Sequence, residues 1–165
     1  MIFVTLGSQK FQFNRLLKEL DRLMEEKKIN EEVFAQIGYS DYKPQHFEYK
    51  EFVDRNEFKE IMDKCDVVIA HGGTGAIITA VKKDKKVIAI PRLAKYGEHV
   101  DDHQIQLVDE FRALNLIYPV YDEKELGNAI EEIRNMEFER YVSNTEKIIE
   151  DIESFIESGR INGEN

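Results

Sequence analysis

A glycine-rich segment between two apolar runs is the feature that most limits how this chain can fold. The segment HGGTG, residues 71–75, follows the run DVVIA at residues 66–70 and precedes the run AIITAV at residues 76–81. A short apolar run rich in β-branched residues is typical of a buried strand, and the second run has the length and composition of a helix start. The segment therefore predicts a strand that passes directly into a helix through glycines.

The same segment predicts a phosphate site. Glycine lets the backbone approach a ligand closely, and the free N–H groups of a first helical turn carry the positive end of the helix dipole. Ile78 stands where a G-x-G-x-x-G fingerprint needs its third glycine, and no GK[ST] sequence follows as in a Walker loop. We expect a diphosphate here, and a tight turn without a ligand is the alternative. The residues concerned are His71, Gly72, Gly73, Thr74 and Gly75.

Short apolar runs alternate with helical patterns along the whole chain. Strands are predicted at residues 2–6, 32–37, 46–52, 66–70, 86–90 and 116–120. Helices are predicted around Leu16, Leu17, Leu20 and Leu23, from a cap at Asp54 to about Lys64, after the glycines, and at residues 103–114, 122–136 and 138–156. This alternation predicts an α/β, Rossmann-like fold with a mostly parallel sheet and helices on both faces.

The length of 165 residues predicts one domain, which we place at residues 1–157, with residues 158–165 as a flexible tail. The helix at 138–156 belongs to that domain and carries an apolar stripe that packs on its own core or on a partner. The stripe consists of Tyr141, Thr145, Ile148, Ile149, Ile152 and Ile156.

Composition excludes several classes of protein. The longest apolar runs have four residues, and the first residues lack the pattern of a secretion signal, so we expect a cytoplasmic protein without a membrane span. A net charge of −10 argues against binding of nucleic acid. The single cysteine, Cys65, cannot form an internal disulfide and is expected to be buried.

A second polar cluster, GEHVDDHQ at residues 97–104, follows the strand at 86–90. His99 and His103, four residues apart with carboxylates nearby, have the spacing of zinc ligands, but Val100 replaces the glutamate of H-E-x-x-H. We therefore do not expect a metal. The alternatives are a helix start, or hydrogen bonds from Asp102 and Gln104 to sugar hydroxyls.

Three segments in order resemble the C-terminal half of family 28 glycosyltransferases. They are FVTLGSQKFQFNRLL at residues 3–17, DVVIAHGGTGAI at 66–77 and VIAIPRLAKYGEHVDDHQ at 87–104. The chain is similar to the small half-enzymes of bacterial capsule and exopolysaccharide synthesis, and to the catalytic subunit of the dolichol-linked N-acetylglucosaminyltransferase. The resemblance covers nearly the whole chain.

The resemblance implies the donor half of a GT-B enzyme, which has two Rossmann-like domains. Such a chain would be an inverting hexosyltransferase subunit that uses a UDP-sugar, needs no metal or other cofactor, and acts on a lipid-diphosphate-linked acceptor. A membrane-anchored partner would supply the acceptor site and bring the chain to the inner face of the membrane. The implied nucleotide-sugar contacts are Gly7, Ser8, His71, Gly72, Gly73, Thr74, Gly75, Glu98, Asp102 and Gln104.

The catalytic base is not identified by the resemblance. Candidates in this chain are His71, His99 and His103, and the partner is another possible source. Thr79 stands where many relatives have a ribose-binding glutamate. Two other functions stay open: a non-catalytic nucleotide-binding or regulatory module, and a metal-dependent hydrolase built on His99 and His103.

Overall fold

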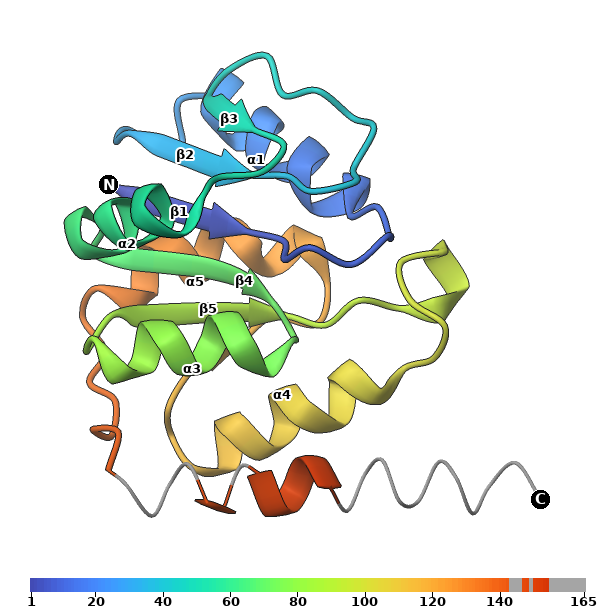
Figure 1. The fold of residues 1–165 in the computed structure, drawn as a ribbon. Coiled ribbons are helices and arrows are strands. Elements are labelled where there is room, and N and C mark those ends of the chain that lie inside the picture. The colour runs from blue at the N-terminus through green and yellow to red at the C-terminus, as the bar shows by residue number, and fades with distance from the viewer. Residues whose placement is uncertain (143–146, 149, 155–165) are drawn as a thin grey trace.

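Six parallel strands form one sheet through the middle of the molecule (Figure 1). The structure is a computed structural model that describes residues 1–142, 147–148 and 150–154. The strand order is β3-β2-β1-β4-β5-β6. The chain first adds strands on one side of β1 and then, from β4 onward, on the other side, as in doubly wound folds. The α/β Rossmann-like fold expected from the sequence is confirmed. The strands are β1 (Ile2–Thr5), β2 (Val33–Gln36), β3 (Glu48–Lys50), β4 (Val67–His71), β5 (Lys86–Ile90) and β6 (Tyr118–Pro119).

Helices cover both faces of the sheet (Figure 1). Helices α1 (Asn14–Glu25) and α5 (Leu126–Ile133) lie on one face. Helices α2 (Arg55–Lys64), α3 (Thr74–Lys82) and α4 (His103–Ala113) lie on the other. Asp54 caps α2 as expected, because its carboxylate accepts a 2.8 Å hydrogen bond from the backbone N–H of Glu57.

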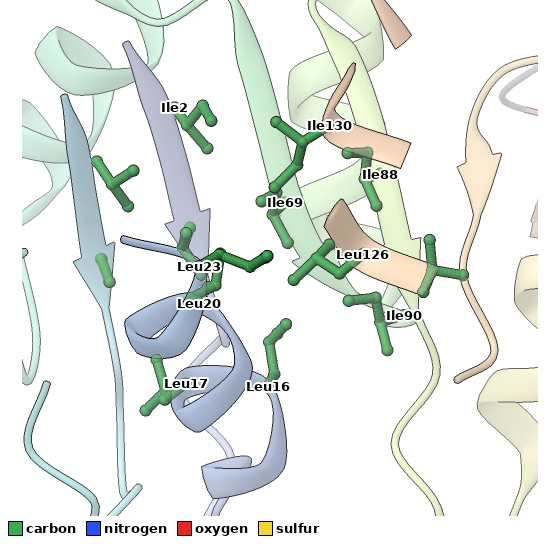
Figure 2. Close-up of a cluster of buried hydrophobic side chains, with 14 of the residues drawn as sticks. Ile2, Leu16, Leu17, Leu20, Leu23, Ile69, Ile88, Ile90, Leu126 and Ile130 are labelled. Atoms are coloured by element: carbon green, nitrogen blue, oxygen red, sulfur yellow. The ribbon is translucent and has the colours of Figure 1, made fainter. Parts of the chain in front are cut away.

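The strands alternate their side chains between two apolar clusters, one on each face. Ile2 and Val4 of β1 pack under α1 and α5, whereas Phe3 between them packs under the opposite layer. Figure 2 shows the first cluster, in which leucines of α1 meet Leu126 of α5 over isoleucines of the sheet. Because both faces are buried, the strands are apolar throughout, which explains why the sequence shows continuous apolar runs.

The C-terminal part differs from the sequence-based expectation. The helix expected at 122–136 is divided into a short 3-10 helix, Glu123–Glu125, and α5. Residues 138–142 are not helical, so the helix expected at 138–156 does not begin there; residues 147–148 and 150–154 are helical. Tyr141 packs against the cluster under α3 and α4, and Ile152 lines a small apolar cavity beside α4. Thr145, Ile149, Ile156 and the tail at 158–165 lie outside the described residues.

Two further predictions concern the single cysteine and membrane-spanning helices. Cys65 is buried, and burial raises the pKa of its thiol, which is the behaviour of a structural cysteine. None of the described helices is long and apolar enough to cross a membrane.

Candidate functional site

A cavity of about 390 Å³ lies at the carboxyl ends of the central strands. Parallel sheets bind ligands at this edge, where the strand order reverses between β1 and β4. The cavity volume lies within the range of small-molecule sites. Its walls come from the ends of β1, β2 and β4, the first turns of α3 and α4, and one C-terminal residue. The polar lining residues include Gly7, Ser8, Gln9, Gln36, His71, Gly73, Thr74, Gly75, Thr79, His103, Gln104 and Glu153.

The N-terminus of α3 opens into this cavity. Gly73 precedes the helix in an extended conformation, and a Cβ added at Gly75 would meet nothing within 4 Å. The hydroxyl of Thr74 donates a 2.9 Å hydrogen bond to the carboxylate of Glu153. An anionic group of the chain itself therefore lies beside the helix N-terminus, where the helix dipole favours negative charge.

The loop after β1 forms the opposite wall. Gly7 has φ +72°, a left-handed conformation that strains other residues. The buried guanidinium of Arg92 holds this loop, because it donates to the carbonyl oxygens of Leu6, Phe11 (3.2 Å) and Gln12 (3.1 Å). Burial lowers the pKa of Arg92 to about 10, which leaves the side chain charged at neutral pH.

His71 ends β4 and is 8% exposed. Its Nδ1 accepts the backbone N–H of Gly73 at 3.2 Å and lies 3.3 Å from Nε2 of Gln104. Burial, followed by the charge of Arg92, lowers the pKa of His71 to about 3. A histidine with this pKa is a poor general base at neutral pH, and it is suited to donating a hydrogen bond through Nε2.

Gln104 lines the cavity but is only 2% exposed. Its Oε1 accepts hydrogen bonds from the backbone N–H groups of Gly72 (3.1 Å) and Arg92 (3.0 Å). Both ends of this amide are therefore engaged within the chain. Gln104 thus has an internal role in this structure, and its expected hydrogen bond to a sugar hydroxyl stays a prediction.

Glu98 and Asp102 do not line the cavity. Glu98 is fully buried, and its carboxylate forms a two-point ion pair with Arg15, at 2.9 and 3.0 Å, and accepts the N–H of Leu93. Asp102 accepts the N–H of Ala94 at 2.8 Å. Both carboxylates shape the loop after β5, and their expected contacts with the nucleotide sugar stay a prediction.

Three polar residues, His99, Asp101 and His103, lie together at the start of α4. Asp101 accepts hydrogen bonds from the backbone N–H of His103 at 3.1 Å and contacts its Nδ1 at 2.7 Å. Among the described residues, the side chains of His99, Asp101 and His103 form the one group able to hold a metal ion, with ligand atoms within 4.8 Å of one another. Their hydrogen bonds account for this arrangement as a helix start. Of the two histidines, only His103 lines the cavity.

Gln36 and Glu153 are among the lining residues that the sequence analysis did not predict. Gln36 ends β2, and its buried Oε1 has no hydrogen-bond partner among the described residues. A polar residue that ends an apolar strand is the signal that would have found it. No comparable sequence pattern marks Glu153, because its position depends on how the C-terminal segment packs. Thr79, which stands at the position of the ribose-binding glutamate of many relatives, also lines the cavity. Its hydroxyl donates to the carbonyl of Gly75.

This geometry agrees with the family indicated by comparison with known proteins. The sequence model of the glycosyltransferase family 28 C-terminal domain matches residues 1–158. The chain belongs to glycosyltransferase family 28. The family expected from the three sequence segments is confirmed, and the match concerns the C-terminal domain of these enzymes.

Two proteins with similar sequences are each named UDP-N-acetylglucosamine transferase subunit ALG13. The protein from Kluyveromyces lactis is 31% identical over 80 residues, which cover 48% of this chain and 39% of the relative. The protein from Candida glabrata is 34% identical over 77 residues, which cover 46% of this chain and 37% of the relative. The matched part thus spans less than two fifths of either relative.

Two solved glycosyltransferase structures share the fold. The kitacinnamycin glycosyltransferase superposes with a TM-score of 0.61 at 15% identity, covering 98% of this chain and 40% of that protein. SnogD from Streptomyces nogalater superposes with a TM-score of 0.51 at 21% identity, covering 81% of this chain and 38% of that protein. The chain therefore has the fold of about two fifths of a larger glycosyltransferase.

Proposed function

We propose that this family 28 chain is the donor-binding subunit of an inverting glycosyltransferase. It would bind a UDP-sugar and, with a membrane-anchored partner, transfer the hexose to a lipid-diphosphate-linked acceptor. The proposed setting is capsular or exopolysaccharide synthesis at the inner face of the cell membrane. The observation that carries the proposal is the N-terminus of α3, which lines the cavity at the ends of β1 and β4 and where the Thr74 hydroxyl donates to a carboxylate.

The chemistry of the cavity supports a diphosphate. The first-turn backbone N–H groups of α3 and the Thr74 hydroxyl suit an anion, and the Glu153 carboxylate already accepts a hydrogen bond from that hydroxyl. These donors can stabilise a leaving diphosphate without a metal ion, so we propose metal-independent chemistry. The open space beside Gly75, where an added Cβ would meet no atom within 4 Å, leaves room for phosphate oxygens.

The names of the relatives suggest the donor to test first. Both yeast proteins are named for transfer from UDP-N-acetylglucosamine, and both are named as subunits. UDP-N-acetylglucosamine is therefore the first donor we propose for this chain. The word subunit in these names supports the proposal that the chain acts with a partner. The match to only about two fifths of each solved glycosyltransferase supports it as well.

Among the candidate bases, His103 fits the reaction best. It lines the cavity, and its Nδ1 lies 2.7 Å from the Asp101 carboxylate, which orients the ring and leaves Nε2 available to accept a proton. His99 does not line the cavity, and its ring packs on Phe11 with a centroid distance of 5.3 Å. We propose His103 as the base for the acceptor hydroxyl, with the partner as the other source.

Calorimetric titration of the purified chain tests the donor assignment. UDP, UDP-N-acetylglucosamine and other UDP-sugars are compared with ADP, CDP and GDP, first with a chelator and then with Mg²⁺ or Zn²⁺. We expect saturable binding of UDP compounds in the chelator. Binding that appears only with metal would contradict the metal-independent site, and no uridine preference would contradict the UDP-sugar assignment.

The transfer step is tested with the partner added. A lipid-linked acceptor and the preferred UDP-sugar should give product only when both proteins are present. Binding without transfer by the complex would favour a non-catalytic nucleotide-binding or regulatory module. Full activity of the chain alone would contradict the need for a partner.

A further inference from the structure

Three side chains that can bind a metal converge where the loop after β5 enters α4. The Nδ1 atoms of His99 and His103 lie 3.4 and 2.7 Å from the same carboxylate oxygen of Asp101. The ligand atoms of the three residues all lie within 4.8 Å of one another. Imidazole nitrogen and carboxylate oxygen are donors that zinc and similar divalent transition metals bind in proteins. The donor set therefore suits such an ion.

The spacing of these atoms is close to that of a metal site. Zinc binds nitrogen and oxygen ligands at about 2.0–2.2 Å, so two ligands of a tetrahedral ion lie about 3.4 Å apart. The distance from His99 to Asp101 already has this value, whereas the hydrogen bond between His103 and Asp101 must open by about 0.7 Å. A cation would take the place of the proton in that hydrogen bond.

The turn around these side chains is already ordered. The ring of His99 is 6% exposed and packs on the ring of Phe11 with a centroid distance of 5.3 Å. Asp102, between the second and third ligands, accepts the backbone N–H of Ala94 at 2.8 Å. Ligands that are held in place before binding lose little conformational entropy when a metal binds. The fold therefore favours binding at this turn.

An ion can reach this turn from solvent. Asp101 is 37% exposed, and His103 lines the cavity. Of the described residues, only the two histidines and Asp101 belong to the group, so water would complete a tetrahedral set. The net charge of −10 adds a long-range attraction for cations.

The missing glutamate of H-E-x-x-H does not argue against a metal here. In that motif the two histidines hold the metal, and the glutamate is the general base of a hydrolase. Val100, which stands in its place and is 74% exposed, therefore removes the base but no ligand. The third ligand is Asp101 instead. A bound ion is thus compatible with a chain that is not a hydrolase.

We propose that His99, Asp101 and His103 bind one zinc-type divalent cation, and that this ion inhibits sugar transfer. The second half rests on the proposed function, in which His103 is the base for the acceptor hydroxyl. A neutral imidazole that binds a metal through Nδ1 carries its proton on Nε2. Nε2 then has no lone pair to accept the proton of the hydroxyl. The ion takes no part in binding the diphosphate, which we place at the start of α3.

Calorimetric titration of the full chain with Zn²⁺ alone, without nucleotide, tests the site. We expect one zinc ion per chain. His99→Gln and Asp101→Asn each remove one ligand and should weaken Zn²⁺ binding by at least about tenfold. His46→Gln is the matched control, because this histidine is 38% exposed and contacts Asp21 instead, and its Zn²⁺ affinity should equal that of the unaltered protein.

Two further measurements do not depend on how well a variant binds in calorimetry. Zn²⁺ should raise the Tm of the unaltered protein and of His46→Gln by mass action, but not that of Asp101→Asn, whose side chain keeps its size. Nitrogen NMR of the chain labelled with ¹⁵N-histidine should show Zn²⁺ shifting the Nδ1 signals of two of the four histidines. Those two signals should be the ones lost in His99→Gln and His103→Gln.

The inhibitory role is measured with the partner present. At full occupancy, Zn²⁺ should lower kcat by about 10²–10⁴, the contribution of a positioned general base. The same free Zn²⁺ concentration should leave the kcat of Asp101→Asn unchanged. Transfer that continues at the full rate with zinc bound would overturn the inhibitory role.

The outcomes separate this inference from the proposed function. Absence of a stoichiometric Zn²⁺ site, or equal Zn²⁺ affinity in the unaltered protein and Asp101→Asn, would overturn the metal site whatever the nucleotide affinity. If Zn²⁺ binds as expected but no UDP compound binds or is used, the metal site stands and the donor function fails. Zinc binding that depends on the three ligands, together with loss of transfer, would support the full proposal.

Discussion

Thr74 donates its hydroxyl hydrogen to the carboxylate of Glu153 at 2.9 Å, which links the first turn of α3 to a helical residue 79 positions later. The contact lies in the cavity where we place the diphosphate of the donor. Two anionic groups cannot occupy the start of one helix without repulsion. If the donor binds as proposed, its diphosphate and the Glu153 carboxylate should compete for this position.

Replacing Glu153 by glutamine should strengthen UDP binding. The neutral amide loses its attraction to the helix dipole, and charges at a helix N-terminus contribute about 0.3–1 kcal/mol, so we expect an increase of about two- to fivefold. Calorimetry of the variant measures this. Glu150→Gln, an exposed change in the same helical segment, is the control, and a UDP affinity in E153Q equal to that of the control would argue against competition.

Substitutions of Gly73 and Gly75, at the start of α3, can be compared directly. A Cβ at Gly73 would lie 2.2 Å from Cε1 of His71, whereas a Cβ at Gly75 would meet no atom within 4 Å. Gly73→Ala should displace the His71 ring and weaken UDP binding by about tenfold, the loss of one charged hydrogen bond. Gly75→Ala should leave the unliganded structure intact, so any loss of affinity there reports contact with the ligand. Equal affinities in G73A and the unaltered protein would contradict the assignment.

His71 should make stability depend on pH. Its folded pKa is about 3, below the ordinary value of 6.5, so the unfolded chain binds a proton that the folded chain excludes. Stability from this group is therefore complete above about pH 6.5 and falls as pH decreases toward 3, by up to about 1.4 kcal/mol per pH unit. Urea unfolding between pH 7 and 5 should show a steeper loss for the unaltered protein than for His71→Asn. Parallel pH profiles would show that His71 is not buried in its neutral form.

Glu98→Gln separates a structural role from a binding role. The Arg15–Glu98 pair is nearly buried, with side chains 11% and 1% exposed, so removing one charge leaves the other unpaired. Loss of one partner from a buried ion pair costs about 3–5 kcal/mol, and Glu123 remains beside Arg15 at 3.0 Å, so we expect the lower value. Chemical denaturation measures this loss. UDP affinity at a temperature where the variant is folded should be unchanged, and a clear decrease would restore Glu98 to the donor site.

His103→Gln tests the proposed base. In the complex with the partner, this change should lower kcat by about 10²–10⁴, because a positioned general base contributes that much, while UDP affinity stays the same. Asp101→Asn should have a smaller effect of the same kind, since it only orients the ring. His99→Gln is the control histidine outside the cavity. Unchanged kcat in H103Q would place the base on the partner.

The sheet and the glycine turn could be predicted because their signals are local. The runs at β4 and β5 are apolar since both faces of the sheet are buried, and glycines mark the passage from β4 to α3. Strand limits agree within two residues with those expected. The prediction of two long helices at the C-terminal end was less accurate. The break before Leu126 and the non-helical residues 138–142 depend on tertiary packing.

The roles of polar residues were harder to predict because their partners are distant in sequence. Glu98 pairs with Arg15, 83 positions away, and Gln104 meets Gly72, 32 positions away. A carboxylate or amide in a family motif looks equally suited to a sugar or to an internal partner. Only the folded chain shows that these two side chains are already used, and that Gln36 and Glu153 reach the cavity instead.

The internal bonding of Glu98 and Gln104 has a consequence for substrate choice. If the start of α3 holds the pyrophosphate as proposed, the internal bonds of these two groups leave fewer side chains to distinguish one hexose from another. The discriminating contacts would then come from the protein that closes over the open side of the cavity. Nucleotide affinity would be a property of this chain, and sugar preference a property of the assembled pair. Exchanging the partner protein would then alter which sugar is transferred, although this chain stays the same.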